Sequence, residues 1–307
     1  MKAQSFSGNT ATASTSINIS GNARQGTGIN VAAGWCVPNS RRCSSCMIRS
    51  FCMSWSTIIT RIFATLDTHE AMQIFHPLFW VNQNGEHPEP YTQISAEDVE
   101  QGRWRVNPAV AHDVADGNLA WLEQYARHYV RTLEASGKYQ LTIWPYHTML
   151  GSLGHALVSS VAEAVFFHSV ARVSKPEFEI KGGHPLTENY SVIRPEVLAA
   201  HDRTRIAQTN TRFIDMVLRY DLVAIIGQAA SHCVAWTIED LLTIIGERAP
   251  GLADKVYILE DCTSPVVVPG VVDYSMEADI AFRRFADMGA HILNSTQPLE
   301  SWPSINV

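Results

Sequence analysis

The sequence predicts an α/β protein whose mostly parallel, doubly wound β-sheet is covered by helices on both faces, giving three α/β/α layers. Strand-like apolar runs alternate with helix-like segments from about residue 57 to residue 295. Strands separated by helices pair in parallel, because each crossover helix returns the chain to the same end of the sheet. With 307 residues, 46% of them hydrophobic, the chain can bury a substantial core.

The predicted strands are short, apolar and rich in β-branched residues. The run TIITRIFATLDTH (57–69) ends in polar residues, as expected of a buried strand that brings side chains to a site at its carboxyl end. DLVAIIG (221–227) is the most strand-like run in the chain. The remaining predicted strands are YQLTIWP (139–145), FEIKGG (178–183), KVYILED (255–261) and AHILN (290–294).

The predicted helices lie between these strands. Apolar residues recur at helical spacing through 118–138, where Gly137 stands at the expected end of the helix. The other predicted helices are 154–172, 203–220, 232–248 and 276–289. The segment NQNGEHPEPYTQIS (82–95) is rich in turn formers and is expected to be a long surface loop.

The first part of the chain has an unusual composition. Residues 1–66 contain no Asp or Glu, although the chain has 30 such residues. An organelle transit peptide is Ser-rich and poor in acids, but Arg24 is the first arginine here, later than such peptides usually show. We favour a disordered N-terminal segment over residues 1–56, and a folded domain over 57–307.

Four of the six cysteines also lie in this segment. A zinc module is a further interpretation, but the spacing is C-x6-C-x2-C-x5-C, with a single C-x2-C pair. The cysteines concerned are Cys36, Cys43, Cys46 and Cys52. An altered reading of the gene's 5′ end is one origin for the disordered segment that we favour.

Charge and hydropathy exclude several classes of partner. The net charge is −7 and no basic face dominates, which argues against nucleic acids and anionic membranes as partners. No run of eighteen apolar residues occurs, and the start MKAQSFSGNTATAST has no apolar stretch typical of a secretory signal. We therefore expect a soluble cytoplasmic protein, with targeting to an organelle as the minor alternative.

Cys233 lies where a predicted strand gives way to a predicted helix, in GQAASHCV (227–234). In a parallel sheet, functional groups collect at the carboxyl ends of strands. A thiol at a helix N-terminus is close to unpaired backbone N–H groups, which favour the thiolate. Most such cysteines are buried structural residues. The preceding small residues, which let the backbone approach a substrate carbonyl, favour a nucleophile here.

This turn resembles the catalytic-cysteine motif of the isochorismatase-like cysteine hydrolases, the family that includes nicotinamidases. In that family a small residue four positions before the cysteine follows a cis peptide bond. The amides of that residue and of the cysteine then form the oxyanion hole. The resemblance maps the cis bond to Gln228–Ala229, and the oxyanion hole to Ala229 and Cys233.

Two further segments resemble the family's metal site. LDTHEAMQIFHPLFW (66–80) carries Asp67 and His69 at D-x-H spacing, and strand alternation would place both on one face. WPYH (144–147) resembles the segment that supplies the third ligand, His147. The resemblance implies a divalent metal, most simply zinc, held by Asp67, His69 and His147, with Trp144 lining the substrate pocket. The metal would hold the substrate's ring nitrogen.

The resemblance also assigns a catalytic lysine but leaves one catalytic residue missing. Lys181, in FEIKGGHPLTENYS (178–191), matches the family's lysine, which stabilises negative charge near the thiolate. The family's general base is an aspartate at the end of its first strand. The strand-like run GINVAAGW (28–35) ends without any acid, so the first strand is expected to be atypical or missing. Asp67 is not expected to replace the base if it binds metal, and Asp261 is expected to be structural.

The resemblance implies a nicotinamidase-like amidohydrolase. It would hydrolyse a small carboxamide such as nicotinamide to acid and ammonia through a cysteine thioester, a reaction of NAD salvage. One alternative is an isochorismatase-type or other small-amide hydrolase, since the stretch between His69 and Trp144 is longer than a compact nicotinamidase needs. The other is a catalytically impaired or non-catalytic family member. The sequence is compatible with a homo-oligomer.

Overall fold

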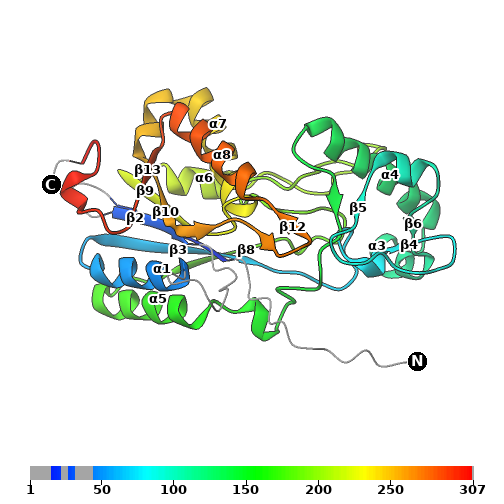
Figure 1. Cartoon of the computed structure of the whole chain (residues 1–307), viewed down its shortest axis with the longest axis horizontal. Helices are drawn as coiled ribbons and strands as arrows, with labels where there is room; N and C mark the ends of the chain where they lie inside the picture. The colour runs from blue at the N-terminus through cyan, green and yellow to red at the C-terminus, as the bar shows by residue number, and fades with distance from the viewer. Residues whose placement is uncertain (1–14, 22–26, 32–43, 306–307) are drawn as a thin grey trace.

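The computed structural model describes residues 15–21, 27–31 and 44–305, which contain a central β-sheet between two helical layers (Figure 1). The strands of this sheet are β1 (Thr15–Gly21), β2 (Thr27–Val31), β3 (Ile59–Asp67), β8 (Glu177–Lys181), β9 (Leu222–Gln228), β10 (Val256–Ser264) and β13 (His291–Leu293). β8 pairs with β3, both β1 and β2 pair with β3 and β9, and β10 and β13 follow β9. All of these pairings are parallel except those of β1. The mostly parallel three-layer fold predicted from the sequence is confirmed.

Helices cover both faces of the sheet. They are α1 (Ser44–Ser54), α5 (Ser159–Arg172), α6 (Thr211–Val217), α7 (Cys233–Arg248) and α8 (Ser275–Asp287). α1 and α5 enclose one apolar core with β3, β9 and β10, and α6, α7 and α8 enclose a second core on the opposite face. β9 is buried along its whole length, because both of its faces are covered.

The N-terminal region differs from the sequence expectation where the structure describes it. α1 lies within the segment for which disorder was expected, and it is packed because Ile48, Phe51 and Cys52 follow the i, i+3, i+4 spacing of one helix face. β2 pairs in parallel with β9, so the first strand is atypical rather than missing. The expectations for residues 1–14, 22–26 and 32–43, including Cys36 and Cys43, lie outside the described residues.

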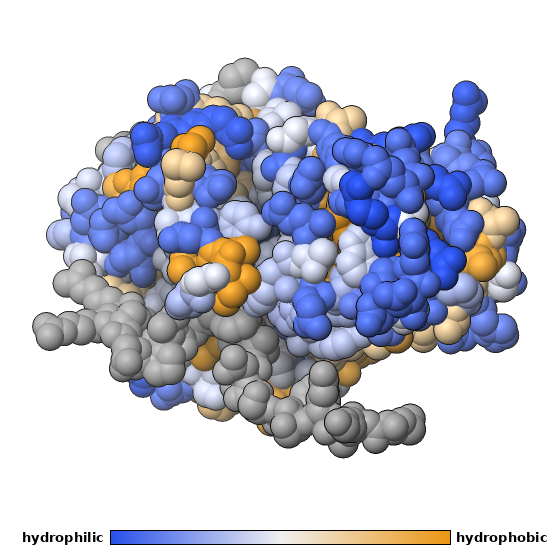
Figure 2. Space-filling view, turned by 45° about the vertical axis from the view of Figure 1, so that its right-hand side comes forward, coloured by the Kyte–Doolittle hydropathy of each residue, from blue (hydrophilic) through white to orange (hydrophobic). Residues whose placement is uncertain are grey.

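A second lobe stands beside the carboxyl ends of the strands (Figure 1). Its elements are β4 (Trp80–Val81), β5 (Gln93–Ile94), α2 (Ala96–Glu100), β6 (Arg105–Val106), α3 (Ala111–Ala115), α4 (Leu119–Ser136) and β7 (Leu141–Thr142). α4 is the helix predicted over 118–138, and Gly137 ends it with φ 69°. The lobe has its own apolar core and presents a largely hydrophilic surface (Figure 2).

Two predicted elements are shorter in the structure. The run 139–145 forms only β7, which pairs with β5 inside the lobe instead of joining the main sheet. The helix predicted over 203–220 is reduced to α6, because the Asn210 side chain accepts the backbone N–H of Phe213 and so starts the helix late. Within the described part of the chain, no helix is both long and apolar enough to cross a bilayer.

Candidate active site

Cys233 is the first residue of α7, directly after the turn that follows β9. The strand runs through the core and ends at Gln228, and the Gln228–Ala229 peptide bond is cis. Gly227 has φ +126°, a conformation that residues with a Cβ rarely adopt. The turn therefore delivers a thiol and the first backbone amides of a helix to the carboxyl end of the sheet.

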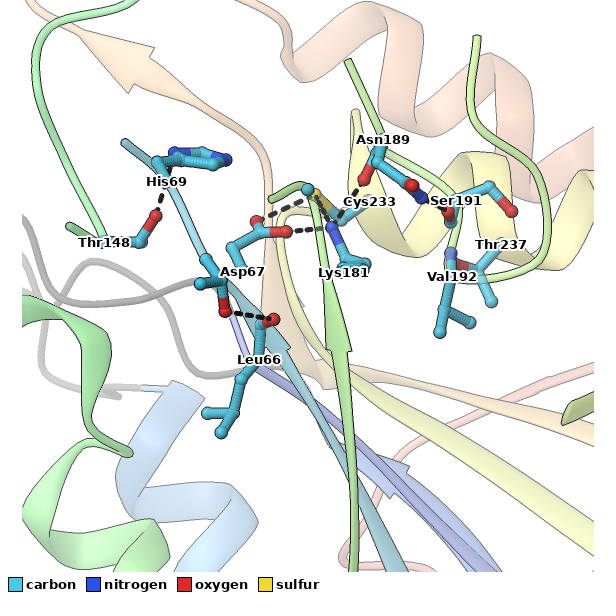
Figure 3. A network of polar contacts seen from close by, with 12 residues as sticks. Leu66, Asp67, His69, Thr148, Lys181, Asn189, Ser191, Val192, Cys233 and Thr237 are labelled. Carbon is cyan, nitrogen blue, oxygen red and sulfur yellow. Dashed lines mark hydrogen bonds and ion pairs between the residues drawn. The ribbon is translucent and has the colours of Figure 1, made fainter. Parts of the chain in front are cut away.

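Asp67 and Lys181 converge on the Cys233 sulfur (Figure 3). β3 and β8 are parallel and in a register that pairs Asp67 with Lys181, so both side chains leave the sheet on the same face. The Lys181 ammonium forms a buried ion pair with the Asp67 carboxylate. The Cys233 thiol donates to Asp67 Oδ2 at 3.6 Å, and Lys181 Nζ lies 3.6 Å from Cys233 Sγ.

The surroundings of Lys181 keep its amine charged. Burial on its own would lower the pKa of Lys181, but the Asp67 carboxylate and the Cys233 sulfur raise it above the usual value. The backbone carbonyl of Asn189 accepts another hydrogen bond from Lys181 Nζ, at 2.8 Å. The ammonium is thus fixed between a carboxylate, a carbonyl and a thiol, and it can stabilise a thiolate.

Three imidazoles form a cluster beside this triad. His69, His76 and His147 each offer a ring nitrogen, and these nitrogens all lie within 4.8 Å of one another. His69 follows β3, His76 follows seven residues later, and His147 comes from the WPYH segment. The rings of His69 and His147 meet edge to face with centroids 4.5 Å apart.

The cluster suits a divalent metal ion. The Nδ1 atoms of His69, His76 and His147 lie 3.2, 2.8 and 2.7 Å from the backbone carbonyls of His147, Glu70 and Pro145, which leaves each Nε2 for a ligand. His76 Nε2 is buried and has no hydrogen-bond partner among the described residues.

Burial favours the neutral imidazoles that a metal requires. It lowers the pKa of all three rings, that of His76 to about 3. The backbone of Gly182 approaches so closely that a Cβ there would lie 3.2 Å from His69 Nε2. The donor set therefore fits zinc, which accepts three imidazoles and an open fourth position.

The predicted metal ligands are divided between these two groups. His69 and His147 come together, but the Asp67 carboxylate is directed at Lys181 and Cys233, apart from the His69 ring (Figure 3). The physical reason is that β3 ends at Asp67. The alternation that would keep Asp67 and His69 on one face does not extend past the end of the strand.

One cavity is lined by Asp67 and Cys233, by His69 and His147, and by an aromatic wall. The volume open to the centre of a water-sized sphere in this cavity is about 90 Å³, which leaves room for a small ligand. Its aromatic lining consists of Phe75, Tyr91, Trp144, Tyr190 and His232. The indole N–H of Trp144 donates to the Tyr190 hydroxyl at 2.6 Å, which fixes the wall. Burial lowers the pKa of His232 to about 4, so this ring is neutral near pH 7.

Glu188 adds a buried carboxyl group to the lining of this cavity. The hydroxyls of Tyr190 and Tyr129 donate to its two oxygens at 2.7 and 2.9 Å. Burial nevertheless raises the pKa of Glu188 to about 8, so the group is largely protonated at neutral pH.

The raised pKa of Glu188 predicts a pH-dependent stability. Its ordinary pKa is 4.5, so the unfolded chain ionises first and the free energy of unfolding should fall between about pH 4.5 and 8. The slope is on the order of 1 kcal/mol per pH unit. Glu188→Gln, which mimics the protonated acid, should match the wild type near pH 5 and be more stable at pH 9. Urea unfolding at the two pH values measures this, and equal pH slopes for both proteins would contradict it.

Several of these residues escaped the sequence analysis. His76 lies in the apolar run MQIFHPLFW (72–80) and looks like a core residue, although it stands seven residues after His69. Glu188 and Tyr190 belong to the ENYS segment that was noted only beside Lys181. His232 directly precedes Cys233, a position that could have marked it as a cavity residue. Asp261 accepts hydrogen bonds from Ser295, a structural contact.

Comparisons with known proteins give similarity only at the level of solved structures. No family model and no curated protein matches the sequence. An Acinetobacter baumanii nicotinamidase/pyrazinamidase is 15% identical over 83% of this chain and 87% of that chain, with a TM-score of 0.48. The yeast nicotinamidase bound to the inhibitor nicotinaldehyde is 15% identical over 85% and 94%, also with a TM-score of 0.48.

A third solved structure contains a metal. The Pyrococcus horikoshii pyrazinamidase in complex with zinc is 16% identical over 75% of this chain and 98% of that chain, with a TM-score of 0.32. At such identities and TM-scores, similarity carries no conclusion about activity. The function therefore has to follow from the geometry of the site.

Proposed function

We propose that this chain is a nicotinamidase-like amidohydrolase of the isochorismatase-like family, which cleaves a small aromatic carboxamide through a Cys233 thioester. One observation carries the proposal. The Cys233 thiol, at a helix N-terminus, contacts both a carboxylate and an ammonium at 3.6 Å inside a small aromatic cavity. A nucleophile beside a proton acceptor and a fixed positive charge is the arrangement that acyl transfer requires.

Asp67 acts as the proton acceptor in the first half of the reaction. It takes the proton of the Cys233 thiol, and the thiolate attacks the carboxamide carbon while Lys181 stabilises the sulfur's charge. The backbone amides of Ala229 and Cys233 stabilise the oxyanion of the tetrahedral intermediate. Asp67 then returns the proton to the leaving nitrogen and the C–N bond breaks. Ammonia departs, and the acyl group remains on Cys233 as a thioester.

Asp67 repeats this role in the second half. A water molecule gives a proton to Asp67 and its oxygen attacks the thioester carbon. The C–S bond breaks, the acid leaves, and the proton returns to Cys233. The balance is one amide and one water in, one acid and one ammonia out. Asp67 thus replaces the aspartate that the resemblance places on the first strand.

His69, His76 and His147 would hold a divalent metal, most simply zinc. Bound there, the metal would supply a positive charge that attracts an electron-pair donor of the substrate. Backbone carbonyls contact the Nδ1 atoms and fix the three rings, so that each Nε2 would face the ion. The Trp144–Tyr190 wall would pack against the substrate ring and exclude water.

The test is ammonia release from nicotinamide by the purified zinc-loaded chain. Wild type should release ammonia and Cys233→Ala should fall to background, because the substitution removes the nucleophile. The matched control is Cys46→Ala, since Cys46 is exposed on α1 and should be dispensable. Equal release by wild type and Cys233→Ala would rule out the nucleophile. No release from nicotinamide or related aromatic amides by a folded, zinc-bound wild type would overturn the amidohydrolase proposal.

A further inference from the structure

An apolar surface at one edge of the sheet is unconnected with the active-site cavity. It comprises Phe166, Val170 and Val173 of α5 with Phe178 and Ile180 of β8, and we call it the α5–β8 surface. These side chains are between 48% and 94% exposed. Monomeric proteins rarely expose contiguous apolar patches of this kind unless a partner covers them.

The strand contributes two side chains to this surface. The register of β8 pairs Phe178 with Ala64 and Ile180 with Leu66, and Ala64 belongs to the core beneath α1 and α5. Phe178 and Ile180 therefore point to the α5 side of the sheet.

The helix presents its own apolar residues as one exposed stripe. Phe166, Val170 and Val173 follow one another at spacings of four and three residues, so they share one side of the helix surface. Residues 174–176 alone separate Val173 from the start of β8.

Val173 is energetically unfavourable in two respects. Its side chain is 94% exposed, and it ends α5 in the left-handed conformation with φ 49°. Gly or Asn normally occupies this helix-terminal position, whereas a β-branched residue there is an outlier. A residue unfavourable both for its exposure and for its backbone suggests that a partner covers it.

β8 is also an edge strand, and its two glutamates, Glu177 and Glu179, are paired with Arg61 and Arg212 of the same chain. Its strand partner is β3, and no other strand of the described residues pairs with its outer edge. Charged or very short strands normally protect such edges, and the opposite edge strand, β13, has only three residues. On the α5 side, β8 instead presents Phe178 and Ile180.

We infer that a second copy of this chain covers the α5–β8 surface, giving a two-fold dimer in which the β8 edges meet antiparallel. An isologous contact needs one self-complementary patch, which an edge strand provides. With 150–250 Å² for an aromatic side chain and less for Val and Ile, the exposed parts amount to about 600 Å² per chain. Two copies would bury about 1,200 Å², the lower bound for a stable interface.

The test is sedimentation of the full-length chain across a concentration series. Wild type should sediment at twice the chain mass of 34.0 kDa. Val173→Asn suits the left-handed backbone and should fold at least as stably, while it removes an apolar contact. It should raise the dimer dissociation constant by about tenfold or more, as should Phe178→Lys, which puts a charge on the edge.

The matched control is Met276→Gln, because Met276 is 67% exposed on α8, on the opposite face of the sheet. It should leave the dimer unchanged. A wild type that sediments as a monomer would overturn the inference. So would a dimer that withstands Val173→Asn and Phe178→Lys, or one that only Met276→Gln weakens. None of these residues lines the catalytic cavity, so the outcome is independent of the proposed activity.

Discussion

Asp67→Asn should lower kcat by a hundredfold to ten-thousandfold while the metal content stays unchanged. The loss is expected because Asp67 accepts a proton in both halves of the proposed reaction. Metal should remain because the Asp67 carboxylate contacts Lys181 and Cys233. The proposed metal ligands are the three clustered imidazoles. Ammonia release and bound zinc, measured on the same preparation, give the two readouts.

The substitution also removes one partner of a buried ion pair. Leaving the buried Lys181 charge unpaired can cost about 3–5 kcal/mol of stability. Circular dichroism and urea unfolding must therefore show that Asp67→Asn is folded at the assay temperature. Asp113→Asn changes an exposed acid on the short helix α3 and serves as the control for activity and stability. If Asp67→Asn loses zinc as well as activity, Asp67 is a metal ligand, and the proton acceptor must be sought elsewhere.

The position of the nucleophile could be predicted because it depends on local sequence. A buried apolar strand, a turn of small residues and a helix pattern follow one another in DLVAIIGQAASHCVAW (221–236), and β9 and α7 form there. The contact between Asp67 and Lys181 depends instead on the pairing of two strands that are far apart in the sequence. β3 and β8 are separated by more than a hundred residues of chain, and only their register sets Asp67 beside Lys181. Sequence periodicity indicates which face of each strand is buried, but it does not identify the residue of β8 that stands beside Asp67.

The third imidazole was missed for a different reason. His76 is fully buried in an apolar run, so its pattern is that of a core residue. Its role emerges only when the segment after β3 and the WPYH segment, which follows β7, reach the same place. The long stretch between His69 and Trp144 forms the lobe, which has its own apolar core.

His76→Ala should weaken zinc binding by about a hundredfold or more, because it removes one of three protein ligands. Changing a residue that only holds a metal ligand in place costs about 10–100-fold in metal affinity, so loss of a ligand itself should reach or exceed that range. The buried His76 Nε2, which has no hydrogen-bond partner within the described residues, should be the atom that the ion engages. Competition with a chromophoric chelator measures the affinity without reference to catalysis.

Two variants separate ligation from general loss of structure. His112→Ala removes an exposed imidazole on α3 and should leave zinc affinity unchanged. Gly182→Ala leaves all three histidines in place but puts a Cβ 3.2 Å from His69 Nε2, at a residue with φ +85°, so it should also weaken zinc binding. If His76→Ala retains wild-type affinity while His69→Ala and His147→Ala lose it, the ion is held by a different set. Asp67 would then be the first candidate for the remaining ligand, and it would no longer be the proposed proton acceptor.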